Sequence, residues 1–388
     1  MPPYLAGREA ESNEFRRLLG QRPIMENLIL TGLRGLGKTV LLETFKPIAI
    51  AEGWLWSGTD LSESASINED NLATRIITDL SVITSPIVIA RKERPNFGFH
   101  TGSVEETVRL DFQVLKSLYD RTPGLISDKL KTVLEQVWSV LSGHNVRGVI
   151  FAYDEAQNLA DHAVKDQYPL SLLLDLFQSI QRKDIPFMLA LTGLPTLFPK
   201  LVEARTYSER MFRVVFLDPL SNSETADAIQ KPIEKENCPI HFSEESIATI
   251  WRITRGYPYF VQYVCRESFD VWAQAGESGK TLPNIPVNEI VRKLDSDFFA
   301  GRWARATDRQ RELLSIVARL ESGAEEFTVQ EIVDSPANKA LDKPFGSSHV
   351  NQMLAALSEA GLVYKNRHGK YSLAVPLLDE FIRRQGQA

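Results

Sequence analysis

The chain has 388 residues, of which 43% are hydrophobic and 24% charged, and its formal net charge at pH 7 is -6. This length exceeds what one hydrophobic core usually serves, so we expect two or three units. The composition excludes a disordered chain, a collagen-like repeat and a small disulfide-built scaffold, and the negative charge argues against broad, nonspecific binding of nucleic acid. The two cysteines, Cys238 and Cys265, lack the spacing of a disulfide framework or a zinc site.

The N-terminal segment has neither the basic start nor the apolar stretch of a secretory signal. No run of the sequence approaches the roughly 18 apolar residues that a membrane-spanning helix needs. We therefore expect a cytoplasmic protein with no membrane association.

The first half of the chain alternates short apolar runs with helical patterns. An apolar run at residues 27–31 leads into a glycine-rich loop, and residues 39–45 have the pattern of a helix start. Residues 62–145 have a mostly helical pattern with a Pro/Gly-containing interruption at 91–102. Short continuous apolar runs are typical of a parallel sheet buried on both faces, so the sequence predicts an α/β fold. The other strand candidates are residues 54–57, 148–153, 186–191 and 213–217.

From residue 221 onward the pattern is mostly helical. Ser221 and Glu224 fit a capping box, Ser243 begins a further helix, and Gly256 can end it. The last part of the chain has three helix patterns followed by two short strands, which is the order of a winged-helix domain. Those patterns lie at residues 309–320, 328–333, 347–360, 362–365 and 370–373. The expected division is a core at 1–218, a helical lid at 219–300 and a winged-helix domain at 301–388.

The glycine-rich loop satisfies the spacing G-x-x-x-x-G-K-[ST] directly after a strand and before a helix. Glycines let backbone N–H groups converge on phosphates, Lys38 reaches the β and γ oxygens, and Thr39 can ligate Mg²⁺. The alternative is a glycine turn with a surface lysine. The sequence favours ATP with Mg²⁺ as the ligand, and the residues expected to bind the nucleotide are Gly32, Leu33, Arg34, Gly35, Leu36, Gly37, Lys38, Thr39 and Val40.

An Asp-Glu pair follows the apolar run at residues 148–153. At the carboxyl end of a strand, Asp154 would hold the magnesium through water, and Glu155 would polarise the water that attacks the γ-phosphate. This is a Walker B arrangement, although an acidic loop after a strand would look the same. The adjacent pair favours hydrolysis over nucleotide holding alone.

Two further catalytic candidates follow in the chain. Thr192 ends the next strand and could sense the γ-phosphate, while a strand-terminal threonine is the plain alternative. Arg205, Arg210 and Arg213 precede the last strand, and one of them could act as an arginine finger on a neighbouring subunit. We select Arg210, with a solvated surface arginine as the alternative.

Together these residues resemble the AAA+ ATPases, in the clade of origin-recognition-like initiators, archaeal-type ATPases and STAND signalling NTPases. The resemblance covers nearly the whole chain and implies a P-loop core, a helical lid and a C-terminal winged-helix domain. It also implies that Arg8, in a Gly-Arg-Glu box, lies near the adenine, and that Pro258, in Gly-Tyr-Pro, lies near the base. Initiator-type relatives carry a sensor arginine three residues after that glycine, where this chain has Tyr259, and Arg255 is a poor substitute.

The winged-helix region leaves the partner open. The start of its presumed recognition helix has no Lys or Arg, and the wing offers Lys365, Arg367, His368 and Lys370. Double-stranded DNA binding needs phosphate contacts, which are few here, so a protein-docking or structural role stands beside a DNA-binding role.

The first functional hypothesis is a DNA-associated AAA+ ATPase switch that binds ATP or ADP and acts through self-association or a partner protein. The second is a STAND-like signalling or scaffold NTPase that assembles on ATP binding without DNA. The third is a component of a defence or mobile-element system. The sequence does not separate these outputs.

Overall fold

The computed structural model describes residues 4–95, 103–238, 241–277, 284–321, 323, 325–367 and 369–386. It divides into two compact units. The sheet unit comprises residues 9–31 and 38–216, and the helical unit comprises the described parts of residues 4–8, 32–37 and 217–386. The predicted boundaries after residues 218 and 300 stay predictions.

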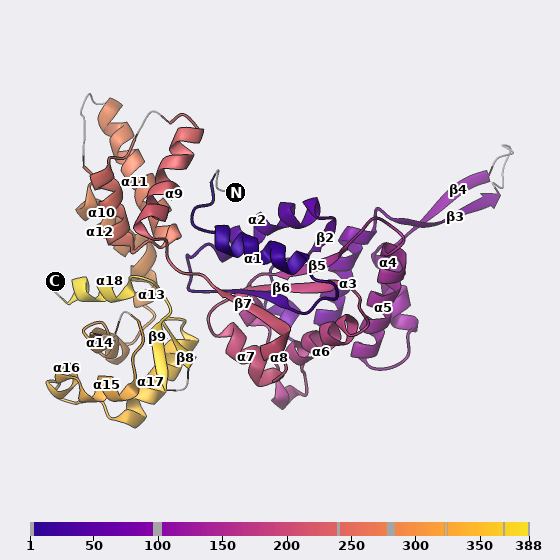
Figure 1. The fold of residues 1–388 in the computed structure, drawn as a ribbon. Coiled ribbons are helices and arrows are strands. Elements are labelled where there is room, and N and C mark those ends of the chain that lie inside the picture. The colour runs from indigo at the N-terminus through magenta and orange to yellow at the C-terminus, as the bar shows by residue number, and fades with distance from the viewer. Residues whose placement is uncertain are drawn as a thin grey trace. The chain divides into compact units, whose positions relative to one another are not determined.

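The sheet unit is built on five parallel strands in the order β2-β5-β6-β1-β7 (Figure 1). Every residue of β1, β5 and β6 is buried, as continuous apolar runs require when both faces of a sheet are covered. The predicted parallel α/β fold is confirmed. The strands are β1 (Asn27–Thr31), β2 (Trp54–Ser57), β5 (Gly148–Tyr153), β6 (Phe187–Gly193) and β7 (Phe212–Phe216).

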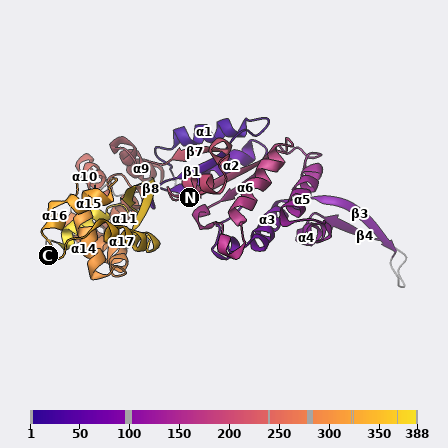
Figure 2. The same ribbon diagram turned by 90° about the horizontal axis from the view of Figure 1, so that it is seen from below.

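Helices cover both faces of this sheet (Figures 1 and 2). Alternate strand residues such as Ile29, Phe151 and Leu189 share one hydrophobic core with α3 (Glu69–Thr84), α4 (Phe112–Arg121), α5 (Ile126–Leu141) and α6 (Pro169–Gln181). On the other face lie α1 (Glu9–Leu19) and α2 (Lys38–Ala51), whose Phe15 and Phe45 rings stack with centroids 4.3 Å apart. The remaining helical segments of the unit are η1 (Ser64–Ser66), η2 (Ala156–Asn158), η3 (Ala163–Lys165), α7 (Leu197–Ala204) and α8 (Ser208–Met211).

A two-stranded antiparallel hairpin, β3 (Val88–Pro95) and β4 (Ser103–Arg109), projects from the sheet unit (Figures 1 and 2). The mostly helical interpretation of residues 62–145 was wrong for this segment. Val, Ile and Thr are frequent around the interruption, and such residues favour strands, whereas the Pro and Gly residues there suggested only a break. Residues 96–102 lie outside the described part.

The helical unit has one continuous hydrophobic core, which joins side chains from α9 to α18. Its helices and strands are α9 (Asn222–Lys235), α10 (Glu244–Thr254), α11 (Pro258–Glu277), α12 (Val287–Leu294), the π-helix η4 (Asp295–Ala300), α13 (Gly301–Trp303), α14 (Asp308–Val317), α15 (Val329–Asp334), α16 (Pro336–Lys339), α17 (Ser347–Glu359), β8 (Val363–Arg367), β9 (Lys370–Leu373) and α18 (Leu378–Gln385). Near the end of the chain, three helices and a hairpin lie where the sequence predicts them, and the structure adds the short helix α16 before the third of these helices and α18 after the hairpin.

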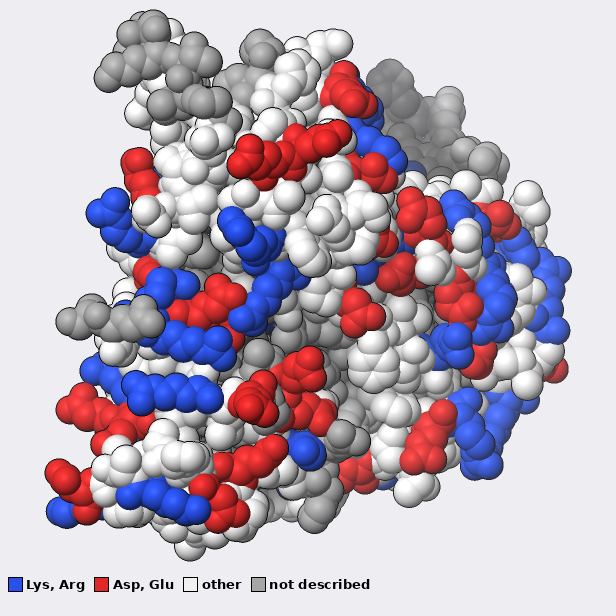
Figure 3. All heavy atoms as spheres, turned by 60° about the vertical axis from the view of Figure 1, so that its left-hand side comes forward, with Lys and Arg blue, Asp and Glu red and all other residues white. Residues whose placement is uncertain are grey.

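Acidic and basic side chains are interspersed on the face drawn in Figure 3, and neither sign forms a continuous patch there. In the described ranges, no helix combines the length and the apolar character needed to cross a membrane.

Candidate functional site

The glycine loop, residues 32–37, follows β1 in the chain and leads into α2, which begins at Lys38. Gly35 and Gly37 have φ values of 82° and 85°, in the left-handed region that favours glycine. A Cβ at Gly37 would meet nothing within 4 Å, so the backbone conformation, and not lack of space, requires glycine there. The first turn of α2 has no acidic residue, which leaves the positive end of its dipole available to an anion.

The carboxylate of Asp154 is the centre of a hydrogen-bonded cluster in the sheet unit. Its Oδ2 accepts a hydrogen bond of 2.5 Å from Oγ1 of Thr39, and its Oδ1 accepts one from Oγ1 of Thr192. The backbone N–H of Glu155 donates to the same Oδ1 at 2.7 Å. Asp154 is only 6% exposed and Thr192 is fully buried. The structure thus brings Thr39, at the start of α2, together with Asp154 and Thr192 at the carboxyl ends of the adjacent parallel strands β5 and β6.

The oxygens of Thr39 and Asp154 fit a magnesium site in which the phosphates of a bound nucleotide supply further ligands. Mg²⁺ is usually held by one or two protein oxygens together with water and substrate phosphates, and Thr39 and Asp154 supply two such oxygens. Across the described residues, no group of three or more His, Cys, Asp or Glu side chains gathers into a metal cage.

Glu155 is exposed at the end of β5 and has a φ of 52°. Its carboxylate Oε2 accepts a hydrogen bond from Nε2 of Gln157, a residue that the sequence reasoning missed. Oε1 of Gln157 accepts a hydrogen bond of 3.2 Å from the backbone N–H of Leu194, just after β6. The only signal in the sequence is the position of Gln157, two residues after the Asp-Glu pair.

In the helical unit, the glycine loop contacts Arg8 and the start of α11. Arg8 is buried, and its Nη2 donates to the carbonyl oxygens of Leu36 at 3.3 Å and Asp218 at 2.8 Å. The backbone N–H of Tyr259 donates to the carbonyl oxygen of Gly35 at 3.1 Å. Pro258, at the first position of α11, directly precedes Tyr259. The expected contacts of Arg8 and Pro258 with the base stay predictions.

Arg255 is engaged elsewhere in the helical unit. Its guanidinium group contacts Oδ2 of Asp379 at 3.0 Å and Oε1 of Glu380 at 2.7 Å, and both partners lie on α18. This pairing agrees with the weak case for Arg255 as a nucleotide sensor.

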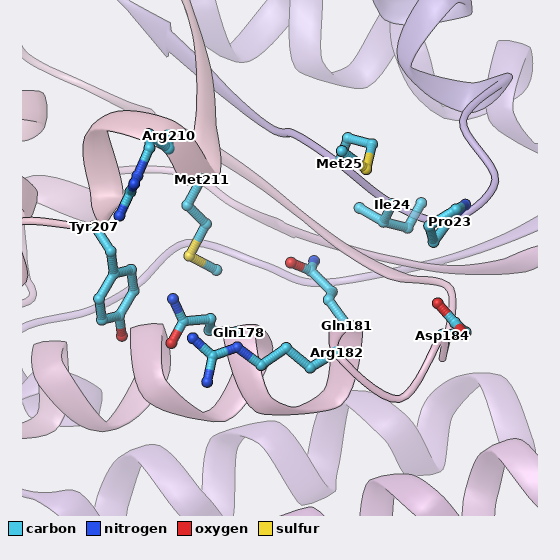
Figure 4. A pocket seen from close by; sticks show the side chains of 10 residues that line it. All are labelled: Pro23, Ile24, Met25, Gln178, Gln181, Arg182, Asp184, Tyr207, Arg210 and Met211. Carbon is cyan, nitrogen blue, oxygen red and sulfur yellow. The ribbon is translucent and has the colours of Figure 1, made fainter.

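The three candidate arginines, of which Arg205 and Arg210 precede β7 and Arg213 lies within it, differ in their partners. Arg205 pairs with Asp175 at 2.8 Å, and Arg213 pairs with Glu14 at 2.5 Å. Arg210 has no ion pair with any described residue. It lines a pocket of about 420 Å³, in which the guanidinium groups of Arg210 and Arg182 lie at one end and Asp184 at the other (Figure 4).

This pocket lies at the amino edge of the sheet, opposite the carboxyl ends where Thr39 and Asp154 meet. Its lining residues directly precede β1, β6 and β7, or end α6. Near the pocket, Nδ2 of the buried Asn27 donates to Oε1 of Gln181 at 3.2 Å, and Nε2 of Gln181 donates to Oδ1 of Asn27 at 2.8 Å. These two hydrogen bonds hold the start of β1 against the end of α6. Within the sheet unit, Arg210 therefore lies at the edge opposite Thr39 and Asp154.

Solved structures of similar fold cover nearly the whole chain. The Walker-type ATPase paby2304 of Pyrococcus abyssi aligns with a TM-score of 0.58 at 17% identity, over 98% of this chain and 96% of that one. The ORC2 protein of Aeropyrum pernix in its ADP form aligns with a TM-score of 0.57 at 15% identity, over 100% and 97%. Its ADPNP-ADP complexes align with a TM-score of 0.54 at 14% identity, over 100% and 97%. This chain shares the α/β fold of these structures.

Sequence matches add little to that likeness of fold. Residues 296–382 match a family described as a domain of unknown function (DUF8462). No curated protein matches the chain. The roles of the individual site residues therefore stay predictions, and so does the winged-helix assignment.

Proposed function

We propose that this chain is a magnesium-dependent ATPase and that its nucleotide state acts as a molecular switch. The observation that carries the proposal is the carboxylate of Asp154, held between the hydroxyl groups of Thr39 and Thr192. Thr39 directly follows the glycine loop and Lys38, so phosphate-binding and metal-binding groups adjoin in the chain. The named activity of the Pyrococcus ATPase and the nucleotides in the ORC2 structures support the same ligand.

The residues divide the work of hydrolysis between binding and proton transfer. Backbone N–H groups of residues 32–40 and the side chain of Lys38 hold the phosphates. Thr39 and Asp154 would hold Mg²⁺, and the ion would neutralise phosphate charge. Glu155 accepts the proton of the attacking water, and Thr192 senses the γ-phosphate.

The helical unit supplies the moving part of the proposed switch. Tyr259 and Arg8 both bond to carbonyl oxygens of the glycine loop, so a change in loop conformation reaches α11 and the N-terminal segment directly. Arg255 lies four residues before Tyr259 and pairs with α18, at the end of the proposed winged-helix domain. Nucleotide binding would thereby reach the C-terminal part of the chain.

We propose that the output is DNA-associated, through the winged-helix elements or a partner. The helix α17 would enter the groove, and Lys365 and Lys370 of the hairpin would contact phosphates. The side chain of Arg367 and residue His368 lie outside what the structure describes. The alternative is a STAND-like switch that assembles without DNA, and the engagement of Arg255 with Asp379 favours it, because no initiator-type sensor arginine is then available.

Arg210 is the proposed arginine finger, acting only on the nucleotide of a second copy of the chain. The opposite location of its pocket within the sheet unit makes action in trans a requirement. Arg182 shares that pocket and is the natural companion cation.

One experiment separates these outputs. Wild type and Glu155→Gln are mixed with a DNA duplex, with and without ATP and Mg²⁺, and DNA binding and particle mass are measured in the same samples. DNA binding that requires ATP supports the first output, and ATP-dependent assembly indifferent to DNA supports the second. Absence of Mg²⁺-dependent nucleotide binding in wild type would refute the proposed function itself.

A further inference from the structure

Gln157 uses both ends of its side-chain amide to connect the proposed catalytic glutamate to the neighbouring strand. Its Nε2 donates to Oε2 of Glu155, and its Oε1 accepts the backbone N–H of Leu194 at 3.2 Å. We propose that Gln157 is a positioning residue that holds the Glu155 carboxylate at a fixed place relative to the end of β6. This inference rests on the proposed ATP hydrolysis.

The chemistry of the two partners makes a carboxamide the fitting side chain. A carboxylate accepts hydrogen bonds only, and a backbone N–H donates only, so the bridging group must donate at one end and accept at the other. The reverse orientation of the amide would set its oxygen against the carboxylate and its NH₂ group against the N–H of Leu194. The hydrogen bonds therefore assign one orientation.

The end of β6 leaves the space that Gln157 occupies. A Cβ at Gly193 would lie 2.7 Å from Oε1 of Gln157, closer than real contacts allow. Gly193 is the last residue of β6 and directly follows Thr192, whose hydroxyl binds Asp154. The bridge thus joins the proposed base to the strand end that carries the proposed γ-phosphate sensor.

Other contacts fix the turn that carries Gln157. Nζ of Lys200 donates to the carbonyl oxygen of Gln157 at 2.7 Å, and burial lowers the pKa of Lys200, against the opposing effect of Asp161. Nδ2 of Asn158 donates to the carbonyl oxygen of Leu61 at 3.0 Å. Because the main chain of η2 is held in this way, rotation of the Gln157 side chain need not move the turn.

The test compares Gln157→Met with Asn158→Ala. Methionine keeps the length of the glutamine side chain and forms neither hydrogen bond. Asn158 lies in the same turn, and its side chain donates to the carbonyl oxygen of Leu61 instead. We expect Gln157→Met to lower kcat about tenfold with unchanged KM and unchanged ATP affinity, because a misplaced base slows chemistry without weakening phosphate binding. We expect Asn158→Ala to keep kcat near wild type, because Lys200 still holds the carbonyl oxygen of Gln157.

Gln157→Glu and Gln157→Asn complete the series. Glutamate has nearly the same shape but sets a second carboxylate against Glu155, so kcat should fall further than in the methionine variant. Asparagine keeps both functional groups on a shorter arm and should recover part of the loss. Equal kcat in wild type and Gln157→Met overturns the proposal, as does an equal loss in Asn158→Ala, which would indicate only a structural role of the turn.

A spectroscopic readout separates this inference from the proposed function. The side-chain amide signal of Gln157 in a ¹H–¹⁵N spectrum is assigned by its loss in Gln157→Met, and it should shift in Glu155→Ala. If the signal shifts in Glu155→Ala but the wild-type protein does not hydrolyse ATP, the contact between Gln157 and Glu155 is supported and the proposed ATPase activity is rejected. If the signal does not shift in Glu155→Ala although the wild-type protein hydrolyses ATP, the proposed contact between Gln157 and Glu155 is rejected.

Discussion

Thr39 and Asp154 lie 115 residues apart in the chain, and the hydroxyl of one donates a hydrogen bond of 2.5 Å to the carboxylate of the other. This contact depends on the sheet order, because β5 and β1 both pair with β6 and their carboxyl ends meet at one edge. Removal of Mg²⁺ with EDTA should abolish ATP hydrolysis, and Asp154→Ala should do so even with excess Mg²⁺. Hydrolysis assayed over a Mg²⁺ titration checks both, and full activity of Asp154→Ala would contradict the metal assignment.

Glu155→Gln should retain ATP binding and lower kcat by about 10²- to 10⁴-fold, the usual range for loss of a general base. The substitution keeps size and removes the proton acceptor. ATP affinity from a fluorescent analogue and phosphate release give the two numbers. Unchanged hydrolysis would exclude Glu155 as the base.

Arg210→Ala should lower kcat by about 10³-fold at protein concentrations that favour assembly, within the range of arginine fingers. Because the finger acts in trans, a mixture of Arg210→Ala with Glu155→Gln should hydrolyse ATP faster than either alone. The first variant supplies an intact site and the second an intact Arg210.

Lys183→Ala is the matched control for the mixing experiment. Lys183 directly follows Arg182 in the chain and forms an exposed ion pair with Glu135. Its mixture with Glu155→Gln should hydrolyse ATP at the rate expected from the two proteins separately. The same absence of recovery with Arg210→Ala would remove Arg210 as the finger.

Cys265 should resist thiol reagents in the folded protein. Burial raises the pKa of its thiol to about 12, so the reactive thiolate at pH 8 is roughly a thousandfold scarcer than for an ordinary cysteine. In a Cys238→Ala background, the rate of reaction with a disulfide reagent should rise by about that factor on unfolding in guanidinium. Fast reaction of the folded protein at pH 8 would show that the thiol is accessible and ionised.

Arg255→Ala should destabilise the helical unit by about 1–3 kcal/mol, because it removes a partner from the buried carboxylate of Asp379. The estimate is below that for a fully buried pair, since Arg255 is partly exposed and Arg383 also lies 3.7 Å from Asp379. Arg252→Ala, at an exposed position of α10, which ends directly before Arg255, should change stability by less than about 0.5 kcal/mol. Urea unfolding compares the two variants, and equal stabilities would remove the pair from the stabilising contacts.

The amino-acid sequence was sufficient to predict the five strands of the parallel sheet and several of the helices. Continuous apolar runs such as residues 148–153 are required when a strand is covered on both faces, and the capping box of Ser221 and Glu224 is local. The β3–β4 hairpin was missed because its pairing depends on segments on either side of residues 96–102.

What the sequence determined alone is the glycine loop, since the spacing of glycines, Lys38 and Thr39 sets the backbone conformation locally. What only the tertiary structure decided is which distant side chains meet it or miss it. Asp154 and Thr192 reach Thr39 because parallel strands end at one edge, Arg210 lies at the opposite edge, and Gln157 bridges Glu155 to Leu194. Spacing along a chain encodes local geometry, whereas the order of strands in a sheet arises from packing between segments far apart in sequence.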